Sequence, residues 1–112
     1  RRAAGSSASV TQEGGSNSSG SIVLQTGTGG GNLATVLQKG DGVFNTSYAK
    51  QDGGTNTAGV TQDGSAGTIN ISNIYQTGSG NGATVGQSGT GIANTSNVTQ
   101  TGAGNTASVT QN

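Results

Sequence analysis

The sequence predicts an all-β fold, a flat β-solenoid in which stacked β-arches form two facing sheets. A short motif recurs along almost the whole chain, and its residues fall at every second position within each copy. A period of two places these residues on one face of a strand, whereas a helix requires a period near 3.6. Repetition at a near-constant interval indicates units that stack on one another.

The composition agrees with stacked β-structure and excludes several classes of function. Only 27% of the 112 residues are hydrophobic, which is too little for an ordinary globular core. Zero net charge, no proline and many Asn, Gln and Thr favour cross-β packing over disorder. Four basic and four acidic residues leave no footprint for nucleic acid, and no apolar run is long enough for a membrane span. We therefore expect neither nucleic-acid binding nor membrane insertion.

Nine seven-residue segments, each ending on glutamine, make up the repeat. Residues 94–111 hold the clearest copy, Asn-x-Ser-x-Val-x-Gln followed by Thr-Gly-Ala-Gly and Asn-x-Ala-x-Val-x-Gln. The second motif position alternates strictly between Ala and Ser, so the structural unit is a Ser-type strand plus an Ala-type strand. We expect a short leader, 1–5, and one solenoid domain, 6–112, made of a half repeat, 6–12, and units 19–38, 45–62, 70–87 and 94–111.

The inward motif positions predict a thin core bordered by two kinds of amide column. A buried amide without a partner is costly, and a column of identical amides supplies the partner in each layer. The first motif position is serine in the two opening segments and asparagine afterwards. The expected ladder residues are Asn32, Gln38, Asn45, Gln51, Asn56, Gln62, Asn70, Gln76, Asn81, Gln87, Asn94, Gln100, Asn105 and Gln111. The expected core residues are Val10, Val23, Val36, Val60, Ile74, Val85, Val98 and Val109, with Ala49 as the one small exception.

Every link between segments begins Gln-x-Gly, which predicts one backbone conformation with positive φ at the glycine. These glycines are Gly14, Gly27, Gly40, Gly53, Gly64, Gly78, Gly89 and Gly102. A four-residue link suits a β-hairpin as well as a β-arc. Hairpins would join neighbouring segments in one sheet with long exposed edges, and we therefore favour arcs that carry consecutive strands into opposite sheets.

The unit Asn-x-Ser-x-Val-x-Gln-x-Gly-x-Gly-Asn-x-Ala-x-Val-x-Gln resembles the curlin repeat of bacterial curli fibres, and the resemblance extends from Ser6 onward. It implies a secreted, extracellular functional amyloid that polymerises with itself and supports biofilm and adhesion. It also implies a nucleator subunit and secretion chaperones as partners. The last repeat is the most regular one, so the chain looks like the major, polymer-forming subunit.

Other chemistries find little support, and we expect no enzyme, no cofactor and no metal site. The glycine-rich links precede strand patterns, whereas a phosphate loop precedes a helix. Asp41, Asp52 and Asp63 lack the second acidic ligand of a calcium loop. A monomeric ice-binding solenoid with outward Thr57, Thr61, Thr106 and Thr110, or a fragment of an adhesin stalk, is the alternative. Outward Ile22, Tyr48, Leu24 and Tyr75 suggest, as a hypothesis, a stripe for lateral bundling.

Overall fold

The computed structural model describes residues 5–14, 19–27, 29–40, 44–64, 68–89 and 93–112, and these residues form strands joined by arcs. The strands are β1 (Ser7–Glu13), β2 (Gly20–Thr26), β3 (Leu33–Lys39), β4 (Phe44–Gly54), β5 (Thr57–Gly64), β6 (Ile69–Ser79), β7 (Gly82–Gly89), β8 (Ala93–Ala103) and β9 (Thr106–Gln111). Each segment with the alternating motif is a strand, as the period of two predicts. The leader predicted for residues 1–5 lies outside the described residues except for Gly5.

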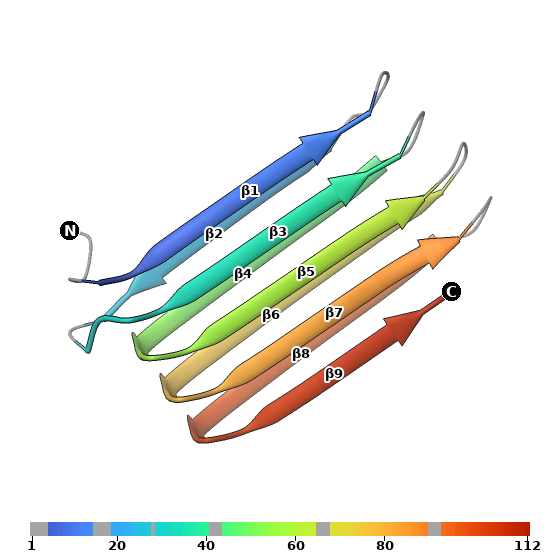
Figure 1. Ribbon diagram of the computed structural model, residues 1–112. Helices are drawn as coiled ribbons and strands as arrows, with labels where there is room; N and C mark the ends of the chain where they lie inside the picture. Colours follow the sequence, from blue (N-terminus) through green and yellow to red (C-terminus); the bar gives the residue numbers. More distant parts are fainter. Residues whose placement is uncertain (1–4, 15–18, 28, 41–43, 65–67, 90–92) are drawn as a thin grey trace.

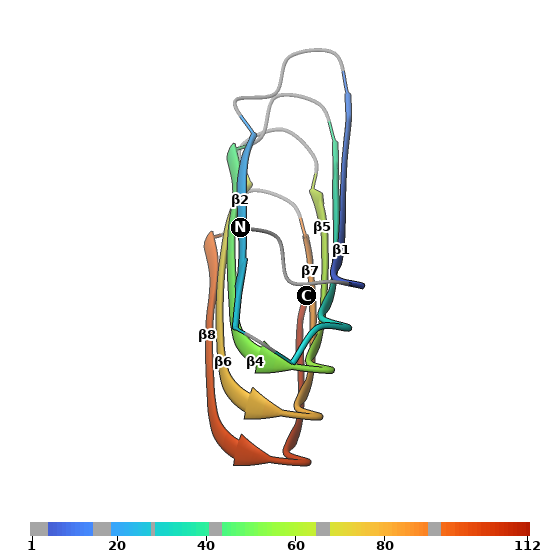
Figure 2. The same ribbon diagram turned by 90° about the vertical axis from the view of Figure 1, so that its left-hand side faces the viewer.

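Consecutive strands lie in opposite sheets. The five-stranded sheet has the order β1-β3-β5-β7-β9, the four-stranded sheet has the order β2-β4-β6-β8, and every pair of neighbours is parallel. Figure 1 shows the five-stranded sheet in front of the other, and Figure 2 shows the two layers edge-on. The molecule is a slab of 41 × 24 × 11 Å. The all-β, two-sheet solenoid is therefore confirmed, and the connections are arcs rather than hairpins.

Each motif residue pairs with the residue at the same motif position in the next strand of its sheet. Each strand of a sheet is one rung of the stack. In the five-stranded sheet Val36 pairs with Val60 and Gln38 with Gln62, and in the four-stranded sheet Ser47 pairs with Ser72. A shift of one residue would turn every inward side chain outward. The register therefore produces straight columns of identical side chains along the stacking axis.

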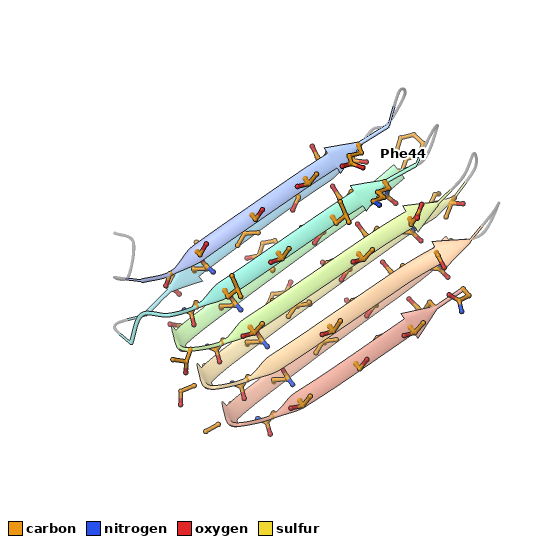
Figure 3. The ribbon with its side chains drawn as sticks, in the orientation of Figure 1. Phe44 is labelled. Carbon is orange, nitrogen blue, oxygen red and sulfur yellow. The ribbon has the colours of Figure 1, made fainter. Side chains whose placement is uncertain are left out.

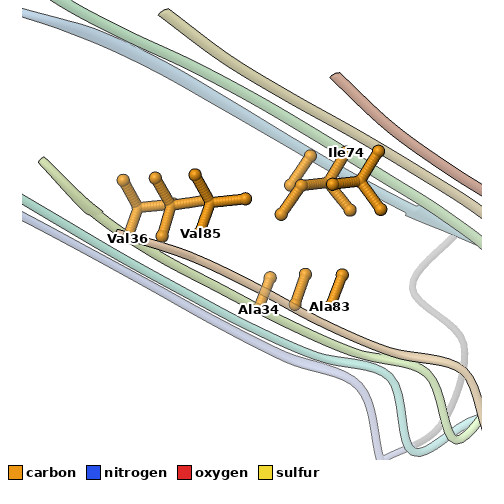
Figure 4. Packing of buried hydrophobic residues seen from close by; sticks show 9 residues of the cluster. Ala34, Val36, Ile74, Ala83 and Val85 are labelled. Carbon is orange, nitrogen blue, oxygen red and sulfur yellow. The ribbon is translucent and has the colours of Figure 1, made fainter. Parts of the chain in front are cut away.

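Except at Ala49, which lies in the column of Val23 and Ile74, the core pairs one large side chain with one small one across the two sheets. Figure 4 shows Ile74 directed at the row of Ala34 and Ala83, with the row of Val36 and Val85 beside it. Because facing strands run in opposite directions, the serine two residues before Ile74 lies opposite the valine row. Alternating large and small residues fill a gap of this kind without voids. The Ala and Ser alternation of the sequence is thus a rule of volume, one small residue facing each valine or isoleucine.

Three of the eight predicted core residues are not buried in the single chain. Val10 in β1 is 47% exposed, and Val23 in β2 and Val109 in β9 are only partly buried. The other five, Val36, Val60, Ile74, Val85 and Val98, are buried together with Ala34, Ala49, Ala58 and Ala83. Strands β1, β2 and β9 each lie at an end of a sheet and lack a neighbour on one side. Strand β8 lies at an end too, yet Val98 is only 6% exposed, so a missing neighbour does not by itself expose an inward valine.

Strands β4, β6 and β8 are longer than the seven-residue motif. Each runs for 11 residues, past the glutamine and through the glycine of the following arc. In β4 and β6 the pairing includes Gly53 with Gly78 and Gly54 with Ser79. The short arcs that join β4 to β5, β6 to β7 and β8 to β9 therefore stack as closely as the strands do.

Candidate assembly site

The inward glutamines form one continuous hydrogen-bonded column in each sheet. In the five-stranded sheet the amide nitrogen Nε2 of each glutamine donates to Oε1 of the next, at 2.8 to 2.9 Å, from Gln12 through Gln38, Gln62 and Gln87 to Gln111. In the four-stranded sheet the same bonds, at 2.9 to 3.0 Å, run from Gln25 through Gln51 and Gln76 to Gln100. Both columns donate toward the C-terminal rung, so each has a defined direction.

The second Nε2 hydrogen of each glutamine joins the two sheets. Gln51 in β4 donates to the backbone oxygen of Leu33 at 3.0 Å, and Gln62 in β5 donates to that of Thr46 at 3.0 Å. A buried amide has two donors and one strong acceptor to satisfy. Each interior glutamine satisfies all three, because it bonds to the rung before, the rung after and the opposite sheet. Gln38, Gln51, Gln62, Gln76 and Gln87 are accordingly buried.

The asparagines of the four-stranded sheet form a second side-chain ladder. Asn70 Nδ2 donates to Asn45 Oδ1 at 2.9 Å, and Asn94 Nδ2 donates to Asn70 Oδ1 at 3.0 Å. This ladder runs opposite to the glutamine columns, since the later residue donates. The other Nδ2 hydrogen bonds to the backbone where the preceding strand ends, at Lys39 O for Asn45 and at Ser88 O for Asn94.

The asparagines of the five-stranded sheet do not follow the simple ladder expected from the sequence. Asn56 Oδ1 accepts the backbone N–H of Asn81 at 3.0 Å, and Asn56 Nδ2 donates to the backbone oxygen of Gly78 at 3.0 Å. Asn32 and Asn81 bond in the same way to the next asparagine and to Gly53 O and Gly102 O. Asn105 and Gln111, on the last rung, are exposed and partly buried respectively. These side chains clamp the short arcs because an arc carbonyl lies within their reach.

The expected positive φ is present at seven of the eight arc glycines and absent at Gly64. The values run from 105° at Gly102 to 146° at Gly89, and the set comprises Gly14, Gly27, Gly40, Gly53, Gly78, Gly89 and Gly102. A Cβ on Gly53 would also collide with the carbonyl oxygen of Gly78. At Gly64 a Cβ would instead meet the side chain of Thr68 at 2.9 Å. Thr68 is itself buried and donates to Gly89 O at 2.9 Å, a contact with no signal in the motif.

A second column of left-handed residues lies directly before the clamping asparagines, and the sequence reading missed it. Its members, with φ from 57° to 72°, are Gly31, Thr55, Gly80 and Gly104. Thr55 has the only positive φ among the described residues that are not glycine. The sequence does contain a signal for this column, because glycine occupies three of these four equivalent positions.

Five serines have a buried hydroxyl oxygen without a partner among the described residues. Within the described residues no hydrogen bond reaches Oγ of Ser19, Ser21, Ser47, Ser72 or Ser96. A buried hydroxyl without a partner costs about 1–3 kcal/mol. The small volume of serine suits its place opposite valine, and nothing among the described residues explains the hydroxyl.

The outer faces of the two sheets differ. On the four-stranded sheet Ile22 pairs with Tyr48, and Leu24 with Lys50, which pairs with Tyr75, as the stripe hypothesis expects. The rings of Tyr48 and Tyr75 lie 5.4 Å apart, and Phe44 is 57% exposed at the start of β4 (Figure 3). A role of this stripe in bundling stays a prediction.

The five-stranded sheet offers no continuous outward column of threonine in its described rungs. Thr61 pairs with Leu37 on one side and with Gly86 on the other, and Thr57 pairs with Leu33 and Gly82. An ice-binding face needs threonines in register, so this surface does not favour the ice-binding alternative. Glu13, Lys39 and Asp63 form the expected column of alternating charge.

The described residues were also considered as a metal site and as a membrane span, and they offer neither a metal-binding cluster nor a spanning helix. They contain no cluster of three or more acidic, histidine or cysteine residues able to hold a metal ion, and Asp41 lies outside them. None of them forms a helix long and apolar enough to cross a membrane.

Residues 73–102 match the family model described as the curlin associated repeat. This stretch is a curlin repeat. It runs from the middle of β6 through β7 to the end of β8, and so covers a full turn of the solenoid. The resemblance found in the sequence is therefore confirmed for these residues. The same in-register pairing joins these residues to the strands before and after them. None of the curated proteins compared with the chain matches it.

Proposed function

We propose that this curlin-repeat chain is the structural subunit of a curli-like extracellular amyloid fibre, and that its activity is its own assembly rather than catalysis. The fibre would contribute to biofilm matrix and adhesion. The curlin repeat and the β-solenoid support a curli-like structural subunit, and the family's fibres point to the cell exterior. A nucleator and secretion chaperones are proposed as partners from the same family likeness.

The identity of successive rungs supports self-assembly more than any other observation. Each strand bonds to the backbone, glutamine and asparagine groups of the next strand in its sheet through the same set of hydrogen bonds. A strand of another copy can therefore form these bonds at the end of the sheet. Most proteins protect such sheet edges against pairing. Here the inward face of β1, with Val10 47% exposed, would be covered by a further copy.

Incubation of the purified chain tests the proposal. We expect thioflavin-positive fibres by electron microscopy and a fibre-diffraction reflection at about 4.8 Å along the axis. Seeds of preformed fibre should remove the lag phase of assembly, because chains can add to an existing fibre end without forming a new nucleus. A chain that stays monomeric by analytical ultracentrifugation after prolonged incubation, with or without seeds, would refute the proposal. Adhesion and biofilm need a separate assay, in which cells displaying the fibre are compared with cells that lack the chain.

A further inference from the structure

We propose that in the fibre successive copies of this 112-residue chain are related by a half-turn about the fibre axis, with β1 of one copy seated on β8 of the copy before it. This inference rests on the proposed function. It concerns which strand meets which, and four features of the two end surfaces carry it.

The first feature is the unequal strand count of the two sheets. Described strands number five in one sheet and four in the other, with β1 and β9 both in the five-stranded sheet. If the next copy stacked without rotation, β1 would pair with β9, and the four-stranded sheet would lack one strand at each junction. A missing strand leaves a row of backbone N–H and C=O groups on β8 without partners, which is costly in a buried place. A half-turn places β1 beside β8 and β2 beside β9, so that neither sheet has a gap.

The second feature is strand direction. The two sheets run in opposite directions, as the bonds from Gln51 to Leu33 and from Gln62 to Thr46 require. A rotation of 180° about the stacking axis exchanges the two sheets and also reverses each strand. The incoming β1 is therefore parallel to β8, like every other pair in the molecule. The rotation keeps the glutamine columns continuous, with Gln100 donating to Gln12 and Gln111 donating to Gln25 of the next copy.

The third feature is the burial of the end rungs. Ala8 and Val10 in β1 are exposed on their inward side, and Ala107 and Val109 in β9 are only partly buried. After a half-turn β1 lies in the sheet opposite β9, and these inward faces cover each other. Val10 then faces Ala107, and Ala8 faces Val109, which maintains the pairing of large with small side chains found inside the chain. Without rotation both faces border the gap.

The fourth feature is the serine that replaces asparagine at Ser6. In the described residues Oδ1 of Asn70 accepts a hydrogen bond from Asn94, while Oδ1 of Asn94, on the last rung of its sheet, accepts none. The half-turn brings Ser6 beside Asn94, where the serine hydroxyl can donate to this oxygen. The arc glycines also continue, since Gly14 stacks on Gly102, and both have positive φ.

Two cysteine pairs separate the two arrangements, because the chain has no cysteine of its own. In the half-turn Thr11 pairs with Thr99 of the neighbouring copy, and without rotation it pairs with Thr110. All three side chains are exposed. Neighbouring strands hold their Cα atoms about 4.8 Å apart, within the range that a disulfide spans. The variants are Thr11→Cys with Thr99→Cys, and Thr11→Cys with Thr110→Cys. The control, Leu37→Cys with Thr61→Cys, joins register partners inside one chain.

Each variant is assembled under reducing conditions, pelleted, oxidised and analysed on a denaturing, non-reducing gel. We expect the Thr11/Thr99 pair to give about tenfold more intermolecular product than the Thr11/Thr110 pair, because only the former lies within disulfide range. The control should give an intramolecular disulfide, detected by mass after alkylation. Predominant cross-linking through Thr110, or cross-linking of neither pair while the control forms, would overturn the half-turn and leave the fibre itself intact. Absence of any pellet would overturn the proposed function, and the half-turn with it.

A helical reconstruction of the unmodified fibre provides an independent test. Nine strands fill four and a half layers, so the half-turn predicts a rise of about 22 Å per copy with a rotation near 180°. Stacking without rotation uses five layers and predicts a rise of about 24 Å with a rotation near 0°. Observation of the second pair of values would contradict the proposal.

Discussion

The two edges of the solenoid are built from the same motif and are held together differently. At one edge short arcs join β4 to β5, β6 to β7 and β8 to β9. At the other edge the longer links lead back to the four-stranded sheet. Asparagine has the same motif position at both edges. At the short arcs Asn56 bonds to backbone groups, Asn81 N–H and Gly78 O, whereas at the other edge Asn70 bonds to the side chains of Asn45 and Asn94.

This difference shows that the path of the neighbouring backbone decides which groups an inward side-chain amide bonds to. The glutamines bond alike in both sheets, because each lies over the first residues of a facing strand, whose carbonyls are placed the same way. The asparagines border the arcs, and the arcs differ in length. From strand to strand, the asparagines of the short-arc edge therefore bond mainly to backbone groups, and those of the other edge bond to each other's side chains.

Alanine at the arc glycines should give the largest difference between the edges. Gly53→Ala introduces a side chain at a φ of 112° and into contact with the next arc, so we expect a loss on the order of 4 kcal/mol in the free energy of unfolding. Gly64→Ala, at the other edge, meets the side chains of Thr68 and Asn70 rather than backbone and lacks a positive φ, and it should lose about 1–2 kcal/mol. Guanidinium denaturation of the assembled chain measures both.

Gly59→Ala is the matched control, because a Cβ there has open space within 4 Å on the outer face of β5. It should leave the denaturation midpoint almost unchanged. Equal losses for the Gly53 and Gly64 variants would show that the two edges are not packed differently.

Removal of the asparagine amide should give an intermediate effect. Asn56→Ala leaves the backbone groups Asn81 N–H and Gly78 O without these partners, and we expect a loss of about 3 kcal/mol. Asn70→Ala breaks two side-chain bonds, while Asn94 keeps its bond to Ser88 O, and about 1.5 kcal/mol should be lost.

Solid-state NMR with hydrogen exchange locates the difference. The amide proton of Asn81 should lose its protection in Asn56→Ala, whereas Asn70→Ala should leave all backbone protection at the short arcs intact. A larger loss from Asn70→Ala than from Asn56→Ala would reverse the proposed roles of the edges.

Thr55 offers the smallest effect and the only expected gain. Threonine holds a φ of 57° where the equivalent residues of the other short arcs are glycine. Asparagine tolerates this conformation better than a β-branched residue, so Thr55→Asn should add about 0.5–1 kcal/mol of stability. Thr57→Asn, on an extended strand nearby, should add nothing. A lower denaturation midpoint for Thr55→Asn would indicate that the 2.7 Å bond from Thr55 Oγ1 to Gly54 O outweighs the strain.

Much of the fold was predictable from the sequence, because the strands and their stacking follow from residues that recur at regular intervals. Alternate residues predicted the strands, and the Ala and Ser alternation predicted two kinds of strand. The exposed edges that hairpins would leave favoured the arcs. The split between the asparagine columns was not predictable, because it depends on which carbonyl an arc brings within about 3 Å of Nδ2. The buried Thr68 beside Gly64 was not predictable either, because it lies outside the motif. The exposure of Val10 could not follow from a motif that treats every rung as interior.

The shared direction of the glutamine bonds gives a growing fibre an electrical axis. Two columns of glutamine amides donate toward the C-terminal rung, and the asparagine ladder of the four-stranded sheet and the bond from Asn105 to Asn81 oppose them. Aligned dipoles add along a helix in the same manner and leave opposite partial charges at its ends. A half-turn about the axis preserves this alignment from one copy to the next. A fibre of many copies would therefore orient in an electric field and present a leading tip unlike its trailing one.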